Sequence, residues 1–591
     1  MSTHDYTTND SERKLNVMVN SLTYTQNWPF LNINAEVSHS YSEQKSPRNL
    51  SFNFNEVNAL QNFDRTVPPT ELPNYAVNNL DNTVLADIYQ YDEYSKDREI
   101  TAKIDLSKEF NLFRKISTKF KLGGKFAYRD REYDYNAAGG FLNYGSGQGA
   151  RDAILNAFPW MQETVQSGSL NLPFPLFFDK GYNPMEFLKG KYDTWPAADI
   201  GLMYDVVDVL KAFGDSEAYR HMDLSSTLYD YSGNEYLNAG YFMTDIQYAN
   251  VIRLIAGVRY EEVRRKYTGI QGNSTIGKPQ TTYVHTDTTT DVTNANLLPI
   301  VHLKYKPVDW FDIRFAYTNT LSRPDYIKII PRLNIGRETI TWKDYKLKPT
   351  RSENFDLYLS FYDNTFGLFT IGGFKKNIED MIFAINGRVL LDPSEIGLSD
   401  SEKGKKLYSD LNNQYAVDLW GIETSWQTNF RYLPGILKGL VLDVNYTHIF
   451  SEAKYPRSIV YTEFIPEPPW YSQTVVDTFY TARMLDQPDD IANVAFGFDY
   501  KGFSGRISLL YQSNIFRGVD FWPELREITD DYWRWDISIK QELPWEGLQL
   551  YFNGRNITGT FDRNLNIGTG YPSSEQYYGR GFDFGIRYRI K

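Results

Sequence analysis

The stretch Phe582-Asp583-Phe584-Gly585-Ile586-Arg587-Tyr588-Arg589-Ile590 decides how the rest of this chain is interpreted. Apolar side chains alternate strictly with charged residues and glycine. Successive side chains of a β-strand point to opposite faces, so this pattern predicts a strand with one apolar and one polar face. We expect the arginines of the stretch, Arg587 and Arg589, to lie on the face opposite to its apolar residues.

The same alternation recurs along the whole chain, for example from Trp533 to Lys540 and from Ile252 to Glu261. The predicted strands run for about ten residues or more, whereas strands of soluble sheets usually have about 5–6. This length matches the span of a tilted membrane strand. We count about 17 strands, which start near Lys14, Asn32, Arg98, Ile116, Asn234, Val251, Asn296, Trp310, Ser352, Phe366, Ala416, Gly439, Ile491, Ser504, Tyr532, Leu548 and Gly579.

The connections between these strands alternate between short and long. Short ones include Lys501-Gly502 and Pro544-Trp545-Glu546, and long ones include the stretches through Asn143 and Trp470. Bacterial outer-membrane barrels have short periplasmic turns and long extracellular loops. The sequence therefore predicts that the short turns lie at one end of the molecule and the long loops at the other. Two loop segments, Asp152 to Gln162 and Leu202 to Phe213, are expected to be helical.

Composition agrees with a membrane barrel. The 591 residues are 16% aromatic, with 45 Tyr and 37 Phe, yet their mean hydropathy is -0.49. A barrel combines these properties because alternate residues face lipid and lumen and because aromatic girdles mark both interfaces. The sequence contains no run of about 20 apolar residues, so it predicts no transmembrane helix. The first residues lack the apolar core of a signal peptide.

Composition also excludes several kinds of site. The chain has no cysteine, which excludes thiolate metal sites and cysteine nucleophiles. Its six histidines show no metal-ligand spacing, and no G-x-S-x-G or H-E-x-x-H motif occurs. The net charge of -12 argues against nucleic-acid binding, which requires a basic surface. We therefore expect no catalytic residues, no metal site and no cofactor.

Several segments resemble the C-terminal β-barrel of TonB-dependent receptors, especially the large forms common in the Bacteroidetes. The resemblance extends over residues 235 to 591 and is thinner before them. It is carried by Ala256 to Glu261, Leu321 to Tyr326, Lys346 to Leu357, Phe374 to Ile382, Gly421 to Thr447, Asn553 to Thr558 and Tyr578 to Arg580.

The resemblance implies an all-β transmembrane antiparallel barrel in the cell outer membrane that is a receptor and not an enzyme. Such a receptor takes up a large scarce nutrient, namely a siderophore, haem, a vitamin or an oligosaccharide, with energy from the inner-membrane TonB complex. Its partners would be outer-membrane lipid, the nutrient ligand and that complex. Residues 1–591 would form one barrel domain.

Family barrels have about 22 strands around a plugged lumen, whereas about 17 strands and no plug domain are found here. The resemblance therefore implies an incomplete receptor, through truncation or gene splitting. We expect that this chain alone does not carry out energy-coupled uptake.

Two kinds of residue are candidates for contacts inside the barrel. Charged residues on the polar face, such as Arg253, Arg259, Glu261, Asp443, Arg534, Asp536, Arg555, Arg587 and Arg589, are expected to line the lumen. Aromatic residues of the long loops either stack on a ligand or pack among themselves, and both readings stay open. These aromatic residues are Trp160, Tyr182, Trp195, Trp470, Tyr471 and Trp522.

Two other function classes remain. The first is a passive porin-like outer-membrane channel, because about 16–18 strands can close around an aqueous pore without a plug. The second is an outer-membrane enzyme or adhesin, which the absence of a catalytic motif disfavours.

Overall fold

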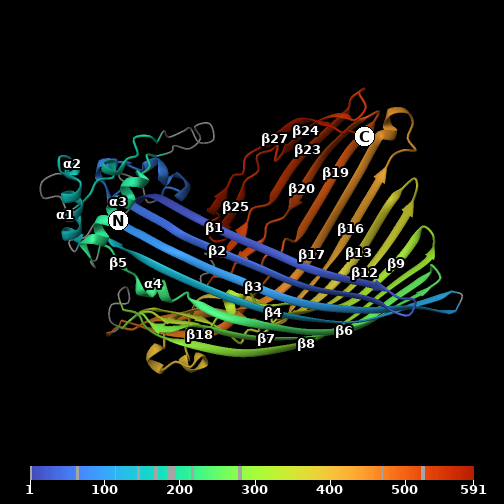
Figure 1. Ribbon diagram of the computed structural model, residues 1–591, viewed down its shortest axis with the longest axis horizontal. Coiled ribbons are helices and arrows are strands. Elements are labelled where there is room, and N and C mark those ends of the chain that lie inside the picture. Colours follow the sequence, from blue (N-terminus) through green and yellow to red (C-terminus); the bar gives the residue numbers. More distant parts are fainter. Residues whose placement is uncertain are drawn as a thin grey trace.

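The computed structural model describes residues 3–60, 66–113, 115–142, 147–165, 171–182, 195–214, 218–276, 282–468, 470–520 and 526–590. Over these residues the chain forms one curled sheet of very long strands, with most of the smaller elements gathered at one of its ends (Figure 1).

Seventeen long strands follow one another through this sheet among the described residues. They are β1 (Thr3–Asn27), β2 (Asn32–Val57), β3 (Thr83–Phe113), β4 (Ile116–Phe141), β6 (Tyr231–Tyr248), β7 (Ile252–Asn273), β8 (Val284–Val308), β9 (Phe311–Ser322), β12 (Thr350–Asp363), β13 (Gly367–Glu379), β16 (Val417–Asn429), β17 (Leu440–Phe464), β19 (Asp490–Tyr500), β20 (Phe503–Gln512), β23 (Tyr532–Glu542), β24 (Leu548–Arg555) and β27 (Gly581–Tyr588). The predicted large antiparallel sheet is thereby confirmed.

Shorter elements lie in the connections. The strands are β5 (Arg220–His221), β10 (Arg332–Ile335), β11 (Thr339–Lys343), β14 (Ile382–Val389), β15 (Lys406–Asn412), β18 (Tyr471–Ala482), β21 (Phe516–Gly518), β22 (Glu527–Thr529), β25 (Asp562–Asn566) and β26 (Pro572–Gln576). The α-helices are α1 (Gln148–Ala157), α2 (Pro159–Gln162), α3 (Ile200–Phe213), α4 (Asp223–Thr227) and α5 (Tyr326–Ile329). The 3₁₀ helices are η1 (Pro69–Tyr75), η2 (Leu80–Asn82), η4 (Phe174–Phe177), η5 (Pro393–Ile396), η6 (Asp400–Glu402) and η7 (Gly435–Gly439).

The long strands form an antiparallel meander in which each strand pairs with the next. Short turns and long connections therefore alternate between the two ends. The turns at Lys501-Gly502 and Pro544-Trp545-Glu546 share the short-turn end, and Trp470 lies in a hairpin at the opposite, long-loop end. This arrangement confirms the predicted sorting of turns and loops, although Asn143 lies outside the described residues.

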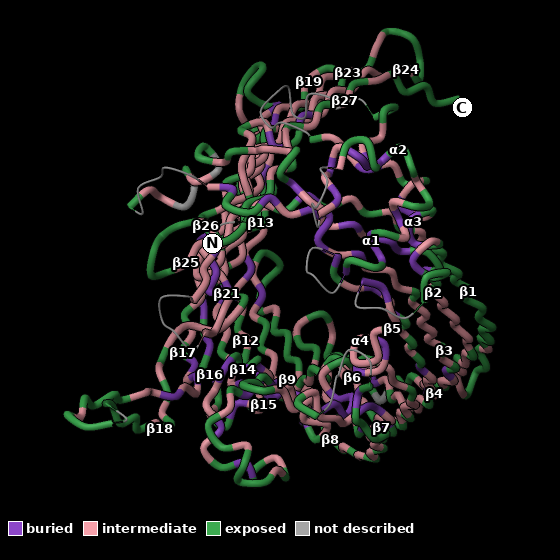
Figure 2. Tube along the Cα trace, turned by 90° about the vertical axis from the view of Figure 1, so that its left-hand side faces the viewer, coloured by how far each residue is buried: buried purple, intermediate pink, exposed green. Residues whose placement is uncertain are grey.

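The two outermost strands of the meander are β1 and β27. Among the described residues, β1 pairs only with β2 and β27 pairs only with β24. Each of them follows the same course, from the long-loop end to the short-turn end. Figure 2, a view onto the long-loop end, shows the sheet curling from β27 round to β1.

Several segments expected to be loops are strands instead. The polar opening before Lys14 belongs to β1, because Thr3 to Glu12 pair with β2. The connection expected between the strands that start near Asn32 and Arg98 is largely filled by β2 and β3, which stay paired as far as Glu56 and Thr83. Part of this stretch still alternates, and its apolar residues Leu50, Phe52 and Phe54 are buried under the smaller elements of the long-loop end instead of facing lipid.

The two faces of the sheet differ as the alternation predicts. Phe582, Phe584 and Ile586 pair with Gly554, Phe552 and Leu550, and they share one face with them. Arg587 lies on the other face, where its guanidinium carbon is 5.8 Å from the ring centre of Tyr551. We call these the apolar face and the polar face.

Aromatic side chains form two rows on the apolar face. At the short-turn end they are exposed and include Trp28, Phe30, Phe113, Tyr248, Trp310, Phe366, Tyr432 and Trp545. The second row contains ring pairs on adjacent strands, such as Trp420–Phe450 at 4.2 Å and Tyr511–Trp533 at 4.0 Å. On β20 the two rows are marked by Phe503 and Tyr511, a separation that matches a tilted strand crossing a hydrocarbon layer.

The two predicted helical segments are helices at the long-loop end. The first is divided at Pro159 into α1 and α2. The second is α3, which Asp199 caps by accepting a hydrogen bond from the amide of Leu202 at 2.9 Å. The helix buries Met203, Val206, Val207 and Leu210 at helical spacing in a cluster with Phe52 and other residues of β1 to β3. No helix among the described residues has the length and apolarity to cross a membrane.

Candidate functional site

The loop aromatics proposed as ligand contacts do not meet at one place. Trp160 lies in α2, whereas Trp470 and Tyr471 form the tip of the β17–β18 hairpin. Figures 1 and 2 place α2 and β18 far apart. Both tip residues are more than half exposed. The hairpin tip and the helical cluster are therefore separate surfaces.

The other three proposed contacts have different surroundings. Trp195 packs edge-on against Tyr6, with ring centres 5.7 Å apart, so part of its surface is in contact with another aromatic side chain. Tyr182 is exposed in a turn begun by Asp179. Trp522 lies outside the described residues.

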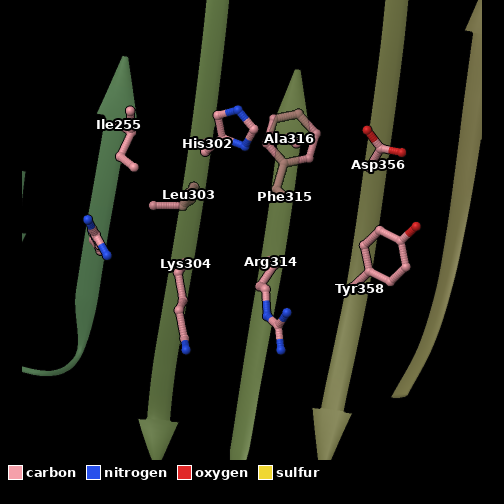
Figure 3. Close-up of a pocket in the computed structure, with 10 residues that line it drawn as sticks. Ile255, His302, Leu303, Lys304, Arg314, Phe315, Ala316, Asp356 and Tyr358 are labelled. Carbon is pink, nitrogen blue, oxygen red and sulfur yellow. The ribbon is translucent and has the colours of Figure 1, made fainter. Parts of the chain in front are cut away.

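A hollow lies in the polar face of β7, β8, β9 and β12, in the half of the strands nearer the short turns (Figure 3). The strand register puts His302, Ala316 and Asp356 side by side. The small side chain of Ala316 leaves room between the other two, and the cavity measures about 480 Å³.

The cations around this hollow pair with carboxylates of the same sheet. Arg253 contacts Asp245 at 2.7 Å, and Lys304 and Arg314 both contact Asp312 at 3.0 Å. Toward the C-terminus, Arg534 pairs with Asp536 at 2.9 Å and Arg555 with Asp583 at 3.6 Å. These ion pairs fit the expected polar lining, because a charge next to a sheet costs least when a neighbour neutralises it.

Tyrosines cover the polar face of β3, β4 and β6 nearer the long loops. The ring centres of Tyr89 and Tyr91 are 5.8 Å apart, and those of Tyr91 and Tyr135 are 5.1 Å apart. Tyr133 then stacks on Tyr231 at 5.7 Å. The sequence analysis missed this row, although the alternate tyrosines of Tyr89-Gln90-Tyr91 and Tyr133-Asp134-Tyr135 carry its signal.

Next to this row, Tyr267 connects two charged residues. Its side chain is 2% exposed. The Tyr267 hydroxyl donates to Glu235 Oε1 at 2.9 Å and accepts from Arg131 Nη1 at 3.1 Å. Arg131 also donates to Asp97 at 3.0 Å, and its guanidinium lies 4.1 Å from the ring centre of Tyr326. This network lies outside the aromatic rows. Burial of the Tyr267 hydroxyl raises the pKa of Tyr267 above its ordinary value.

The connection between β9 and β12 folds back onto this network. Ile329, Ile330 and Leu347 of the connection are buried with Tyr267 in one apolar cluster. Between the connection and the sheet lies a cavity of about 440 Å³. We call this cavity the arginine basin; its walls include Arg129, Arg131, Arg265, Arg323, Glu235 and Glu261.

The basin is lined by Glu261 and by Arg323 to Tyr326, the second part of the Leu321 to Tyr326 segment, both of which the sequence analysis names. Arg265 was missed, because Arg264-Arg265-Lys266 carries charge on both faces and hides the alternation. Among the described residues no group of three or more His, Asp or Glu side chains is arranged to hold a metal ion.

The comparisons with known proteins concern most of the chain. A family model described as "TonB dependent receptor-like, beta-barrel" matches residues 22–557. The siderophore receptor PiuA from Acinetobacter baumannii has a similar structure, with a TM-score of 0.53 at 10% sequence identity, covering 98% of this chain and 65% of PiuA. The chain thus spans just under two thirds of that relative.

A second similar structure is a double mutant of the Serratia marcescens hemophore receptor HasR in complex with its hemophore HasA and heme. Its TM-score is 0.48 at 11% identity, covering 100% of this chain and 71% of HasR. No curated protein matches the chain in sequence.

Proposed function

The chain belongs to the TonB-dependent receptor-like β-barrel family, and on this basis we propose that it acts in the outer membrane as a receptor and transporter for a large scarce nutrient, energised by the TonB complex. Siderophores, haem, vitamins and oligosaccharides are the candidate nutrients. We further propose that residues 1–591 act as one barrel domain, with the polar face toward the lumen.

One observation carries this proposal. The apolar face with its two aromatic rows suits lipid, whereas the polar face bears the ion-paired wall and the arginine basin. The basin lies nearer the long loops, where a ligand from outside would arrive. The exposed loop aromatics Trp160, Tyr182, Trp470 and Tyr471 are proposed as first contacts for that ligand.

The test is uptake in a receptor-deficient Gram-negative host that exports the chain. Membrane fractionation should place it in the outer membrane, and cells that export it should bind radiolabelled candidate nutrients. In line with the expectation that this chain alone does not carry out energy-coupled uptake, these nutrients should not accumulate even when the host has its TonB complex. Equal uptake with and without TonB would replace the proposal by the passive channel. Recovery of a folded chain only from soluble fractions would contradict the membrane location itself.

A further inference from the structure

Arg265 on β7 is a buried cation that forms no ion pair within the described residues. Its side chain is 6% exposed. Its Nη2 atom donates to Asn294 Oδ1 at 2.7 Å and to the carbonyl of Leu347 at 3.1 Å. Both acceptors are neutral, and within the described part of the chain no carboxylate lies at ion-pair distance from Arg265. Burial, together with the nearby Arg323, lowers the pKa of Arg265.

Three carboxylates line the arginine basin with Arg265, and each has other partners; Asp325 accepts from the amide of Ile327 at 3.1 Å. Glu235, opposite Arg265 on β6, accepts from Tyr267 and lies 3.5 Å from Arg131. Glu261 is paired with Arg259 at 2.6 Å and with Arg323. Glu235 acts on Arg265 through its charge, but Glu235 and Glu261 are both shared with other residues, so Arg265 has only part of a counter-charge, which is costly in a buried position.

Arg265 lines the arginine basin, and part of its guanidinium forms no hydrogen bond with a described residue. Both of its hydrogen bonds to described residues leave from Nη2, so the Nε and Nη1 hydrogens remain for another acceptor. Arg265, Asn294 and Asn296 all line the cavity. A volume of about 440 Å³ falls in the range of small-molecule sites.

We propose that the arginine basin binds a carboxylate group of the nutrient, with Arg265 as its anchor. The inference rests on the proposed function and names the chemical class of its ligand as an anion with carboxylate oxygens. A carboxylate oxygen accepts strong charge-assisted hydrogen bonds from a guanidinium, and the Nε and Nη1 hydrogens of Arg265, which point in different directions, can each donate one to a separate oxygen. Arg323 adds positive potential, and the amide of Asn296 supplies a further polar contact at the wall.

The test is calorimetric titration of the full chain, folded in detergent, with propane-1,2,3-tricarboxylate as the probe. Arg265→Gln keeps a polar side chain but removes the charge, and it should weaken binding about tenfold to a hundredfold. The matched control is Arg264→Gln. Arg264 is the next residue on β7, but it lies on the opposite face and pairs with Asp291 at 2.6 Å. Its replacement should leave the affinity unchanged.

A second variant separates binding from folding. Asn294→Asp places a carboxylate beside Nη2, so Arg265 gains a permanent counter-charge. The variant should resist unfolding at least as well as the wild type and yet lose affinity for the probe. Gel mobility before and after heating verifies that each variant is folded.

Three results would overturn the inference. They are equal affinity of wild type, Arg265→Gln and Asn294→Asp, absence of binding by the folded wild type, and binding of inorganic phosphate with no binding of the tricarboxylate. Failure of the proposed function looks different, because uptake independent of TonB would leave probe binding by Arg265 intact. Loss of probe binding, in turn, would not change the binding of an uncharged nutrient by cells that export the chain.

Discussion

The ring of Tyr267 on β7 lies directly over the backbone of Gly233 on β6. A methyl group at residue 233 would come within 2.1 Å of the Tyr267 ring and 2.6 Å of the carbonyl of Lys266. The absence of a side chain at Gly233 thus lets the Tyr267 hydroxyl reach Glu235 and Arg131.

Gly233→Ala should displace Tyr267 and lower the free energy of unfolding by about 1–3 kcal/mol, the usual cost of overpacking. Urea unfolding in detergent, followed by tryptophan fluorescence, measures it. Gly240→Ala on the same strand is the control, because its added methyl would meet nothing closer than 3.9 Å. Equal effects of the two substitutions on the free energy of unfolding would show that the position of the Tyr267 ring does not depend on the missing side chain at Gly233.

Tyr267→Phe tests the hydroxyl itself. Without it, Arg131 and Glu235 keep their mutual contact at 3.5 Å and Arg131 keeps Asp97, but each loses a buried hydrogen bond. We expect a loss of about 1–2 kcal/mol in the free energy of unfolding. The same urea experiment applies, and an unchanged midpoint would mean that water replaces the hydroxyl without cost.

Asp230, just before β6, predicts a pH effect on stability. Burial raises the pKa of Asp230 to about 7, and the nearby Asp134 adds to the rise. The amide of Tyr135, which donates to Asp230 at 3.0 Å, opposes the rise, as do the nearby Arg332 and His285. A carboxyl whose pKa is raised on folding stabilises the fold while it is protonated. The free energy of unfolding should therefore fall as pH rises from about 4 to about 7, and it should then level off.

Asp230→Asn should remove that part of the pH dependence. Thermal midpoints of the variant and the wild type from pH 4 to 8 measure it. Parallel pH profiles for the two proteins would contradict the assignment.

The two faces of β8 predict unequal tolerance of charge. Val301 pairs with Ala256 on the apolar face, whereas Ile300 pairs with Gly257 on the polar face. Val301→Arg should cost roughly 2–4 kcal/mol, because the charge would enter lipid near mid-depth. Ile300→Arg should fold and insert. The yield of heat-modifiable barrel in liposomes compares the two, and equal yields would refute the facing of β8.

Sequence reasoning reached the fold because period-2 alternation is strongest where a strand crosses lipid. The predicted starts at Asn32, Ile116, Tyr532 and Leu548 coincide with observed strand starts. The strand start expected near Arg98 was wrong, because β3 begins much earlier, at Thr83. The first half of β3 has polar residues on both faces, so the sequence shows no clear alternation there.

The candidate site was less accessible to such reasoning. Trp160 and Trp470 are conspicuous in the sequence, yet the structure separates them. Arg265 gains its importance only from Asn294 on β8 and Leu347 in a distant connection. No local sequence pattern shows that Glu235 and Glu261 contact other residues. The missing ion pair of Arg265 can therefore be recognised only from the three-dimensional contacts.

The shared course of β1 and β27 imposes a parity rule on any closed form of this sheet. Two strands that run the same way cannot join by antiparallel hydrogen bonds. A seam made directly between them would be parallel, and an antiparallel closure needs an odd number of strands placed between them. Lipid offers no hydrogen bonds to a bare edge, at a cost of several kcal/mol for each group left unpaired. Crosslinks between cysteines introduced along β1 and β27 would distinguish a direct parallel seam from edges held apart by intervening strands.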